Sequence, residues 1–160
     1  MTDQIPNDDN AIAIERIFDA PPERVFRAWS DPEQVAKWYG PEGFSLSVCE
    51  IDFRVGGKFL YRMRSDKGHE FWYGGVFTQI IENELIVCTN YIADPHGNPV
   101  PSGMEDWPDE STLRVRFEDA GGKTKLTLTH EGLPPSKMRD QAASGYIQTL
   151  DKLANHLAET

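Results

Sequence analysis

The stretch SKMRDQAASGYIQTLDKLANHL, Ser136 to Leu157, decides the fold. Its apolar residues recur at steps of three and four, which predicts a long helix with one apolar face. The positions on that face are Met138, Ala142, Tyr146, Leu150, Leu153 and Leu157. Pro134 and Pro135 precede the helix, and Ser136 can cap its first turn. A helix of about 20 residues is roughly 30 Å long, so it can cross a small domain and needs a sheet to lie on.

Most of the chain before this helix alternates apolar and polar residues, which is typical of strands joined by hairpins. Strands are predicted at 11–18, 44–53, 59–64, 71–81, 85–92, 113–117 and 124–130. A shift in the alternation predicts a bulge near Cys49–Glu50, and Gly74–Gly75 marks a bend or a close approach. Two short helices, starting at Pro22 and Pro32, separate the first two strands, and Asp31 can cap the second.

The predicted fold is therefore α+β. It is a helix-grip in which a curved antiparallel sheet of about seven strands and two short helices hold one long C-terminal helix. We expect a single domain over residues 11–160, preceded by a loose tail at residues 1–10. Asp52 and Arg54 are expected to form an ion pair that fixes the double-glycine turn at Gly56–Gly57, and the alternative is that Arg54 binds an anion.

The composition excludes several functions. The 160 residues carry a net charge of −10, which argues against nucleic acid and against an anionic membrane surface as partners. The chain has no apolar run of about 20 residues and no signal peptide at its start, so we expect a cytoplasmic location. Cys49 and Cys88 lie far apart without a CxxC spacing, as in a reducing compartment.

Five blocks of sequence, in order along the chain, resemble the activator-of-heat-shock-ATPase-homologue family of the START-like, polyketide-cyclase and birch-pollen-allergen superfamily. They are RIFDAPPERVFRAWSDPEQVAKWYGP (16–41), VCEIDFRVGGKF (48–59), GGVFTQI (74–80), LTLTHEGLP (126–134) and GYIQTLDKLA (145–154). In the last block Tyr146 stands where the family usually has tryptophan. The resemblance implies a deep apolar cavity between sheet and last helix. Members bind lipids, polyketides or hormones, some catalyse cyclisation or hydrolysis, and some act on a chaperone.

Residues able to do chemistry are few. The four histidines are scattered without metal-ligand spacing, so neither a metal nor a cofactor is expected. Ser45, Ser47, Ser65 and Ser111 have no evident base beside them. His130, at the end of the last strand, is the candidate catalytic residue or ligand anchor. The alternative is a histidine that bonds loop carbonyls between strand and helix.

The aromatic residues are more numerous than a small core needs, which favours a partly hollow interior that binds a small apolar or aromatic ligand. The predicted lining residues are Trp38, Phe59, Tyr61, Met63, Trp72, Tyr91, Trp107, Met138, Ala142 and Tyr146. Tyr61, Tyr73 and Tyr91 can present hydroxyls to the cavity or simply to water. The irregular segment 93–110, with Met104 and Trp107, is interpreted as a lid or as a surface loop.

Two other functions stay open at this point. One is a module that modulates a chaperone or another protein, and the other is a cyclase-type or hydrolase-type enzyme acting in the cavity. A homodimer through an open sheet edge is also possible.

Overall fold

The computed structural model describes residues 10–159. Seven strands form one antiparallel sheet in the order β1-β7-β6-β5-β4-β3-β2. The elements, in chain order, are β1 (Ala11–Phe18), α1 (Pro22–Ser30), α2 (Pro32–Trp38), β2 (Phe44–Ile51), β3 (Lys58–Ser65), β4 (Glu70–Ile81), β5 (Leu85–Ile92), β6 (Ser111–Asp119), β7 (Thr124–Glu131) and α3 (Lys137–Ala158). The predicted α+β helix-grip is confirmed. Nine of the ten residues of the expected loose tail lie outside the described residues.

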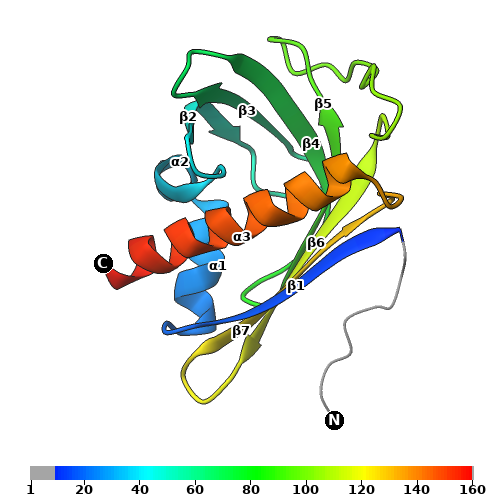
Figure 1. Ribbon diagram of the computed structural model, residues 1–160. Helices are drawn as coiled ribbons and strands as arrows, with labels where there is room; N and C mark the ends of the chain where they lie inside the picture. The colour runs from blue at the N-terminus through cyan, green and yellow to red at the C-terminus, as the bar shows by residue number, and fades with distance from the viewer. Residues whose placement is uncertain (1–9, 160) are drawn as a thin grey trace.

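The sheet curls around the long helix (Figure 1). In this view α3 crosses the concave side of the sheet, and α1 and α2 lie beside its C-terminal half. The strands β1 and β2 form the two sheet edges, and dimerisation through either edge stays a prediction. Among the described residues, α3 is the longest helix, and neither it nor the two short helices has both the length and the apolar character of a membrane span.

The helix caps and the ion pair expected from the sequence are present. The Asp31 carboxylate accepts a hydrogen bond from Glu33 N at 3.0 Å at the start of α2, and Ser136 Oγ accepts one from Arg139 N at 3.0 Å at the start of α3. These bonds satisfy backbone donors that a helix start leaves free. The Asp52–Arg54 ion pair is present, with Arg54 Nε 2.9 Å from Asp52 Oδ2.

The bulge predicted near Cys49–Glu50 lies earlier in β2. The pairing with β3 shifts between Leu46 and Val48, so Ser47 is the extra residue. Leu46 and Cys49 are both packed against the core. Because an extra residue reverses the side-chain alternation, Val48 leaves the core face. A second shift, between Phe77 and Gln79 in β4, had not been predicted.

The packed core occupies only one part of the space between sheet and helix. Leu150 and Leu153 on α3 are fully buried, as are Leu126 and Leu128 on β7 and Trp38 on α2. The residues of α3 that are buried all lie in its second half. Earlier on the same apolar stripe, Met138, Ala142 and Tyr146 are only half-buried. The first half of the helix therefore covers something other than a close-packed core.

Candidate functional site

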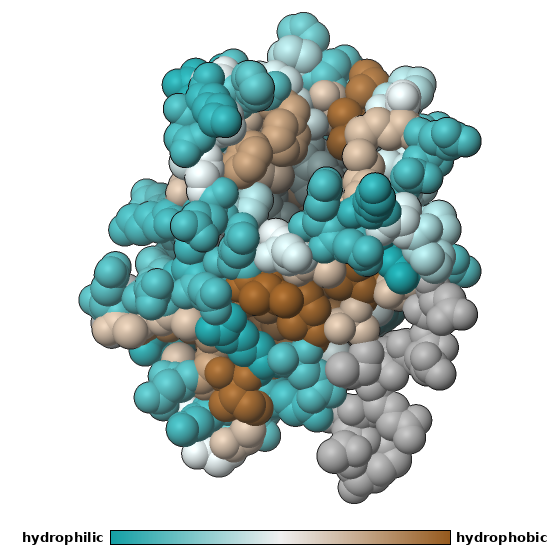
Figure 2. All heavy atoms as spheres, viewed as in Figure 1, coloured by the Kyte–Doolittle hydropathy of each residue, from teal (hydrophilic) through white to brown (hydrophobic). Residues whose placement is uncertain are grey.

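A cavity of about 340 Å³ lies beneath the first half of α3. Its wall comes from the α2–β2 connection, β3, β4, β5, β7, α3 and the segment 93–110. The sixteen lining residues are Tyr39, Gly40, Pro41, Met63, Phe71, Tyr73, Ile92, Met104, Trp107, His130, Met138, Gln141, Ala142, Gly145, Tyr146 and Thr149. The space-filling view shows its opening as a hollow above α3 (Figure 2). The cavity thus occupies the part of the space between sheet and helix that the packed core does not fill.

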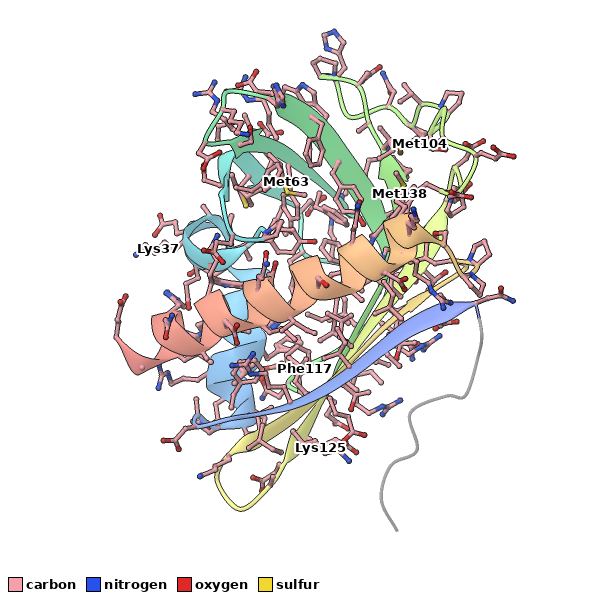
Figure 3. The ribbon with its side chains drawn as sticks, viewed as in Figure 1. Lys37, Met63, Met104, Phe117, Lys125 and Met138 are labelled. Carbon is pink, nitrogen blue, oxygen red and sulfur yellow. The ribbon has the colours of Figure 1, made fainter. Side chains whose placement is uncertain are left out.

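The wall is apolar and uncharged. None of the sixteen residues is Asp, Glu, Lys or Arg. Three of them are Met63, Met104 and Met138, which are all the methionines that the structure describes. Figure 3 shows these three around the opening, with Phe117 on the other side of α3 in this view. Methionine is flexible and polarisable, so these three side chains can adjust to groups of different shape.

His130 is a buried polar residue in the cavity wall that bonds hydroxyls on two other elements. It is 1% exposed, and the β6–β7 register places it opposite Leu113. Side chains two residues apart share one face of a strand, so Ser111 on β6 is its diagonal neighbour. The Ser111 hydroxyl lies 2.6 Å from His130 Nε2, and the Tyr146 hydroxyl on α3 lies 2.8 Å from His130 Nδ1. A histidine held between two hydroxyls therefore joins the sheet to the helix over the cavity.

The surroundings of His130 keep its ring neutral. Burial lowers the pKa of His130 to about 4, because an imidazolium ion would lose its hydration there. The Trp107 and Tyr146 rings both pack against the imidazole in T-shaped arrangements, each with its centroid 5.8 Å from that of His130. The alternative that His130 bonds loop carbonyls is wrong, since both ring nitrogens bond hydroxyls. Ser111 does have a base beside it, contrary to the sequence-based expectation.

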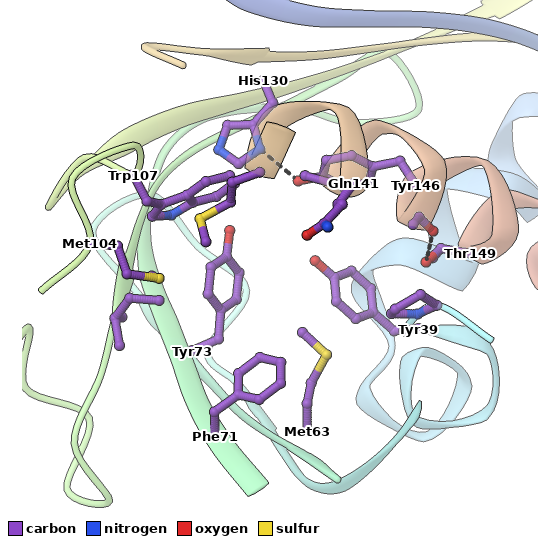
Figure 4. A pocket seen from close by; sticks show the side chains of 16 residues that line it. Tyr39, Met63, Phe71, Tyr73, Met104, Trp107, His130, Gln141, Tyr146 and Thr149 are labelled. Carbon is purple, nitrogen blue, oxygen red and sulfur yellow. Dashed lines mark hydrogen bonds between the residues drawn. The ribbon is translucent and has the colours of Figure 1, made fainter. Parts of the chain in front are cut away.

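Three tyrosines present hydroxyls to the cavity (Figure 4). Burial raises the pKa of Tyr39, Tyr73 and Tyr146 above the ordinary value of 10, so all three stay protonated near neutral pH. The close-up shows the hydroxyls of Tyr39 and Tyr73 pointing toward the space below Gln141. Thr149 has its donor occupied, because its hydroxyl donates to Gly145 O at 2.8 Å. The polar tips of the wall are thus mainly uncharged hydroxyls.

The segment 93–110 closes one end of the cavity with Met104 and Trp107. The Ser102 hydroxyl donates to Trp107 O at 2.6 Å, and Ser102 N donates to Asp109 at 2.9 Å. These hydrogen bonds join residues within the segment and so stabilise its conformation. Its opening and closing as a lid stays a prediction.

The structure brings together part of the predicted lining. Met63, Trp107, Met138, Ala142, Tyr146 and the candidate His130 lie in the wall. Phe59 and Tyr61, on the same strand as Met63, are absent from the cavity wall and line an inner void of about 30 Å³. Their rings pack against each other with centroids 4.9 Å apart, so this end of β3 belongs to the core.

Three further predicted residues lie away from the wall. Trp38 is fully buried, and its indole Nε1 donates to Ala28 O at 3.0 Å. Trp72 lies under the Arg62 guanidinium, which is 5.5 Å from the ring centroid. Trp72 and Tyr73 are consecutive on β4 and point to opposite faces of the sheet, so only Tyr73 points inward. The Tyr91 hydroxyl donates to Gly97 O at 3.5 Å, outside the cavity.

The other wall residues were not predicted as lining residues, apart from two that were considered with alternatives. Tyr73 was expected to present its hydroxyl to the cavity or to water, and Met104 to lie in a lid or a surface loop. Tyr39, Gly40 and Pro41 follow α2, where no periodic pattern exists. Phe71 and Tyr73 are two residues apart on β4, so their shared face could have been found from the alternation. Gln141 and Thr149 flank the apolar stripe of α3, and a cavity wider than that stripe reaches them.

No group of three or more His, Cys, Asp or Glu residues that could hold a metal ion occurs in residues 10–159.

A curled seven-stranded antiparallel sheet gripping one long helix over a cavity defines a START-like α+β protein. The model of the family described as activator of Hsp90 ATPase homolog 1-like protein matches residues 19–158, and the chain belongs to this family. The family and the fold are consistent with a ligand-binding or an activator-type domain. No curated protein matches the chain.

Solved structures of bacterial proteins agree with this placement. Protein CV1439 from Chromobacterium violaceum is 30% identical, with a TM-score of 0.78 over 91% of this chain and 95% of that one. The AHSA1 protein from Silicibacter pomeroyi is 25% identical, with a TM-score of 0.75 over 92% and 97% of the two chains. An uncharacterised protein from Rhizobium leguminosarum is 26% identical, with a TM-score of 0.75 over 94% and 95%.

Proposed function

We propose that this protein binds a small, uncharged, largely aromatic molecule in the cavity beneath α3. The observation that carries the proposal is the cavity itself, about 340 Å³ of space walled by aromatic rings and methionines without a single charged side chain. Ligand sites are typically concave, mostly apolar and provided with a few polar groups. Here the polar groups are the hydroxyls of Tyr39, Tyr73 and Tyr146 with the neutral His130 behind the last of them.

The size and the charge of the cavity define the class of ligand. A dry cavity of about 150 Å³ holds one benzene ring. A space of about 340 Å³ therefore accommodates a molecule of two or three rings. An anion would have to leave water without meeting a cation in the wall, which is costly. We therefore expect neutral ligands to bind and their acidic analogues to be rejected.

A matched pair of fluorescent probes tests this function. N-phenyl-1-naphthylamine is neutral, and 8-anilinonaphthalene-1-sulfonate carries the same ring system with one negative charge. We expect the neutral probe to bind with enhanced fluorescence and the sulfonate to bind at least about tenfold more weakly. Neutral ligands that displace the probe should raise the melting temperature, since a ligand of the native state stabilises it.

A pair of tryptophan substitutions on one helix locates the binding. Ala142→Trp puts a large side chain into the cavity, and we expect it to abolish probe binding. Ser144→Trp adds the same side chain two residues away at an exposed position that does not line the cavity, and it should leave binding unchanged. Equal binding by both variants would contradict the proposed function.

A further inference from the structure

The hydrogen bonds around His130 run in one direction, and this direction determines what the cavity recognises. The Ser111 side chain is buried, and His130 Nε2 is its only hydrogen-bond partner among the described residues. A buried hydroxyl that did not donate would leave its proton without an acceptor, which costs free energy. Ser111 therefore donates to Nε2, and Nε2 is the acceptor nitrogen of the ring.

The proton of the neutral imidazole must then be on the other nitrogen. A neutral histidine carries one N–H, so the acceptor role of Nε2 makes Nδ1 the donor. Nδ1 lies 2.8 Å from the Tyr146 hydroxyl, and it donates to the phenol oxygen there. The O–H of Tyr146 is not needed by His130 and can point into the cavity that Tyr146 lines, where the Tyr73 hydroxyl is its other hydrogen-bonding neighbour.

We propose that Tyr146, positioned by Ser111 and His130, donates a hydrogen bond to a carbonyl oxygen of the ligand, and that the ligand is an uncharged aromatic ketone or quinone. This inference rests on the proposed function and adds the class of polar group to it. A carbonyl fits because it only accepts hydrogen bonds and carries no charge. A ligand whose polar groups are all hydrogen-bond donors would meet another donor, the Tyr146 O–H, and would form no hydrogen bond with it.

The hydroxyl donor comes from α3, where Tyr146 lines the cavity and contacts His130. Ser111 and His130 are positioning residues in this scheme, since neither needs to touch the ligand oxygen. Their effect on binding passes through the orientation of the Tyr146 hydroxyl.

Two nearly isosteric probes test the inference. 2-Acetylnaphthalene carries a carbonyl oxygen where 2-isopropenylnaphthalene carries a methylene group, and both have the two-ring size that the cavity fits. We expect Tyr146→Phe to weaken binding of the ketone about tenfold, because a buried carbonyl would lose its donor. The hydrocarbon should bind wild type and Tyr146→Phe within about twofold of each other. Tyr91→Phe removes a hydroxyl outside the cavity and should change neither affinity.

The tautomer of His130 gives a readout that does not depend on any ligand. Long-range proton–nitrogen NMR correlations distinguish Nδ1–H from Nε2–H. We expect the Nδ1–H form in the wild type and the Nε2–H form in Ser111→Ala, where Nδ1 is free to accept from Tyr146. Ser111→Ala should also weaken ketone binding severalfold without changing hydrocarbon binding.

The outcomes separate the two proposals. If neither naphthalene binds the wild type, the proposed function itself fails. If the hydrocarbon binds but the ketone shows no dependence on Tyr146, or if wild-type His130 carries its proton on Nε2, only the carbonyl inference is overturned.

Discussion

Lowering the pH from 7 to 5 should cost the protein about 2 kcal/mol of stability through His130 alone. Burial lowers the pKa of this histidine from its ordinary value of 6.5 to about 4. The unfolded chain therefore takes up a proton near pH 6.5 that the folded chain accepts only near pH 4. Stability is fully present above pH 6.5 and decreases as the pH falls through this window.

The magnitude follows from the size of the shift. A difference of about 2.5 pH units at about 1.36 kcal/mol each gives a total of about 3 kcal/mol, of which about 2 kcal/mol is lost by pH 5. The groups that face the ring, Ser111, Trp107 and Tyr146, are uncharged at these pH values, so none of them offsets the cost of charging it.

Urea unfolding of the wild type and of His130→Gln at pH 7 and pH 5 measures this contribution. The substitution lowers stability at both values because it disturbs two hydrogen bonds, but it removes the titrating ring. The wild type should therefore lose about 2 kcal/mol more than the variant between pH 7 and pH 5. His69→Gln, at an exposed position on the β3–β4 hairpin, is the matched control and should follow the wild type. The reasoning would be refuted if wild type and His130→Gln lost the same amount of stability between pH 7 and pH 5. An NMR titration of His130 centred near pH 6.5 would refute it as well.

Two glycines give opposite predictions that the same urea experiments check at pH 7. A Cβ at Gly75 would lie 2.4 Å from Thr89 O and 2.5 Å from Phe59 Cε1, so Gly75→Ala should lower the free energy of unfolding by about 1–3 kcal/mol. Gly145 is inside α3, and a Cβ there would meet only Pro41 at 3.5 Å. Gly145→Ala should therefore raise the free energy of unfolding by about 0.5–1 kcal/mol, as glycine-to-alanine changes in helices do. A stable Gly75→Ala or a destabilised Gly145→Ala would show that the backbone at that position has moved.

The order and type of the elements could be predicted because they depend on local signals. Period-two and period-3.6 patterns, prolines at helix starts and glycine turns each act within a few residues. The position of the β2 bulge could not be predicted in the same way. Ser47 is the extra residue only because of how Leu46 and Cys49 pack against the core, and that packing involves distant segments.

The candidate site was only partly predictable for a related reason. Alternation along β3 correctly puts Phe59, Tyr61 and Met63 on one face, but it contains no information about where the core ends and the cavity begins. That boundary depends on which aromatic rings of the α2–β2 connection and of β4 fill the space above each residue. Of the three, only Met63 reaches the cavity, and the other two are covered by neighbouring rings.

The two halves of α3 differ in what they cover: the second half packs against the core, and the first half forms part of the cavity wall. Leu150 and Leu153 are fully buried against the sheet, so large-to-small changes there remove well-packed apolar contacts at a typical cost of about 2–5 kcal/mol. Met138 and Ala142 lie on the same stripe but face empty space, so comparable changes create no new cavity in a packed region. The wall over the cavity can therefore vary in sequence without unfolding the protein. The packed second half of α3 holds the fold, so the first half is less constrained by packing, and Tyr146, between the two halves, connects the cavity wall to the buried His130.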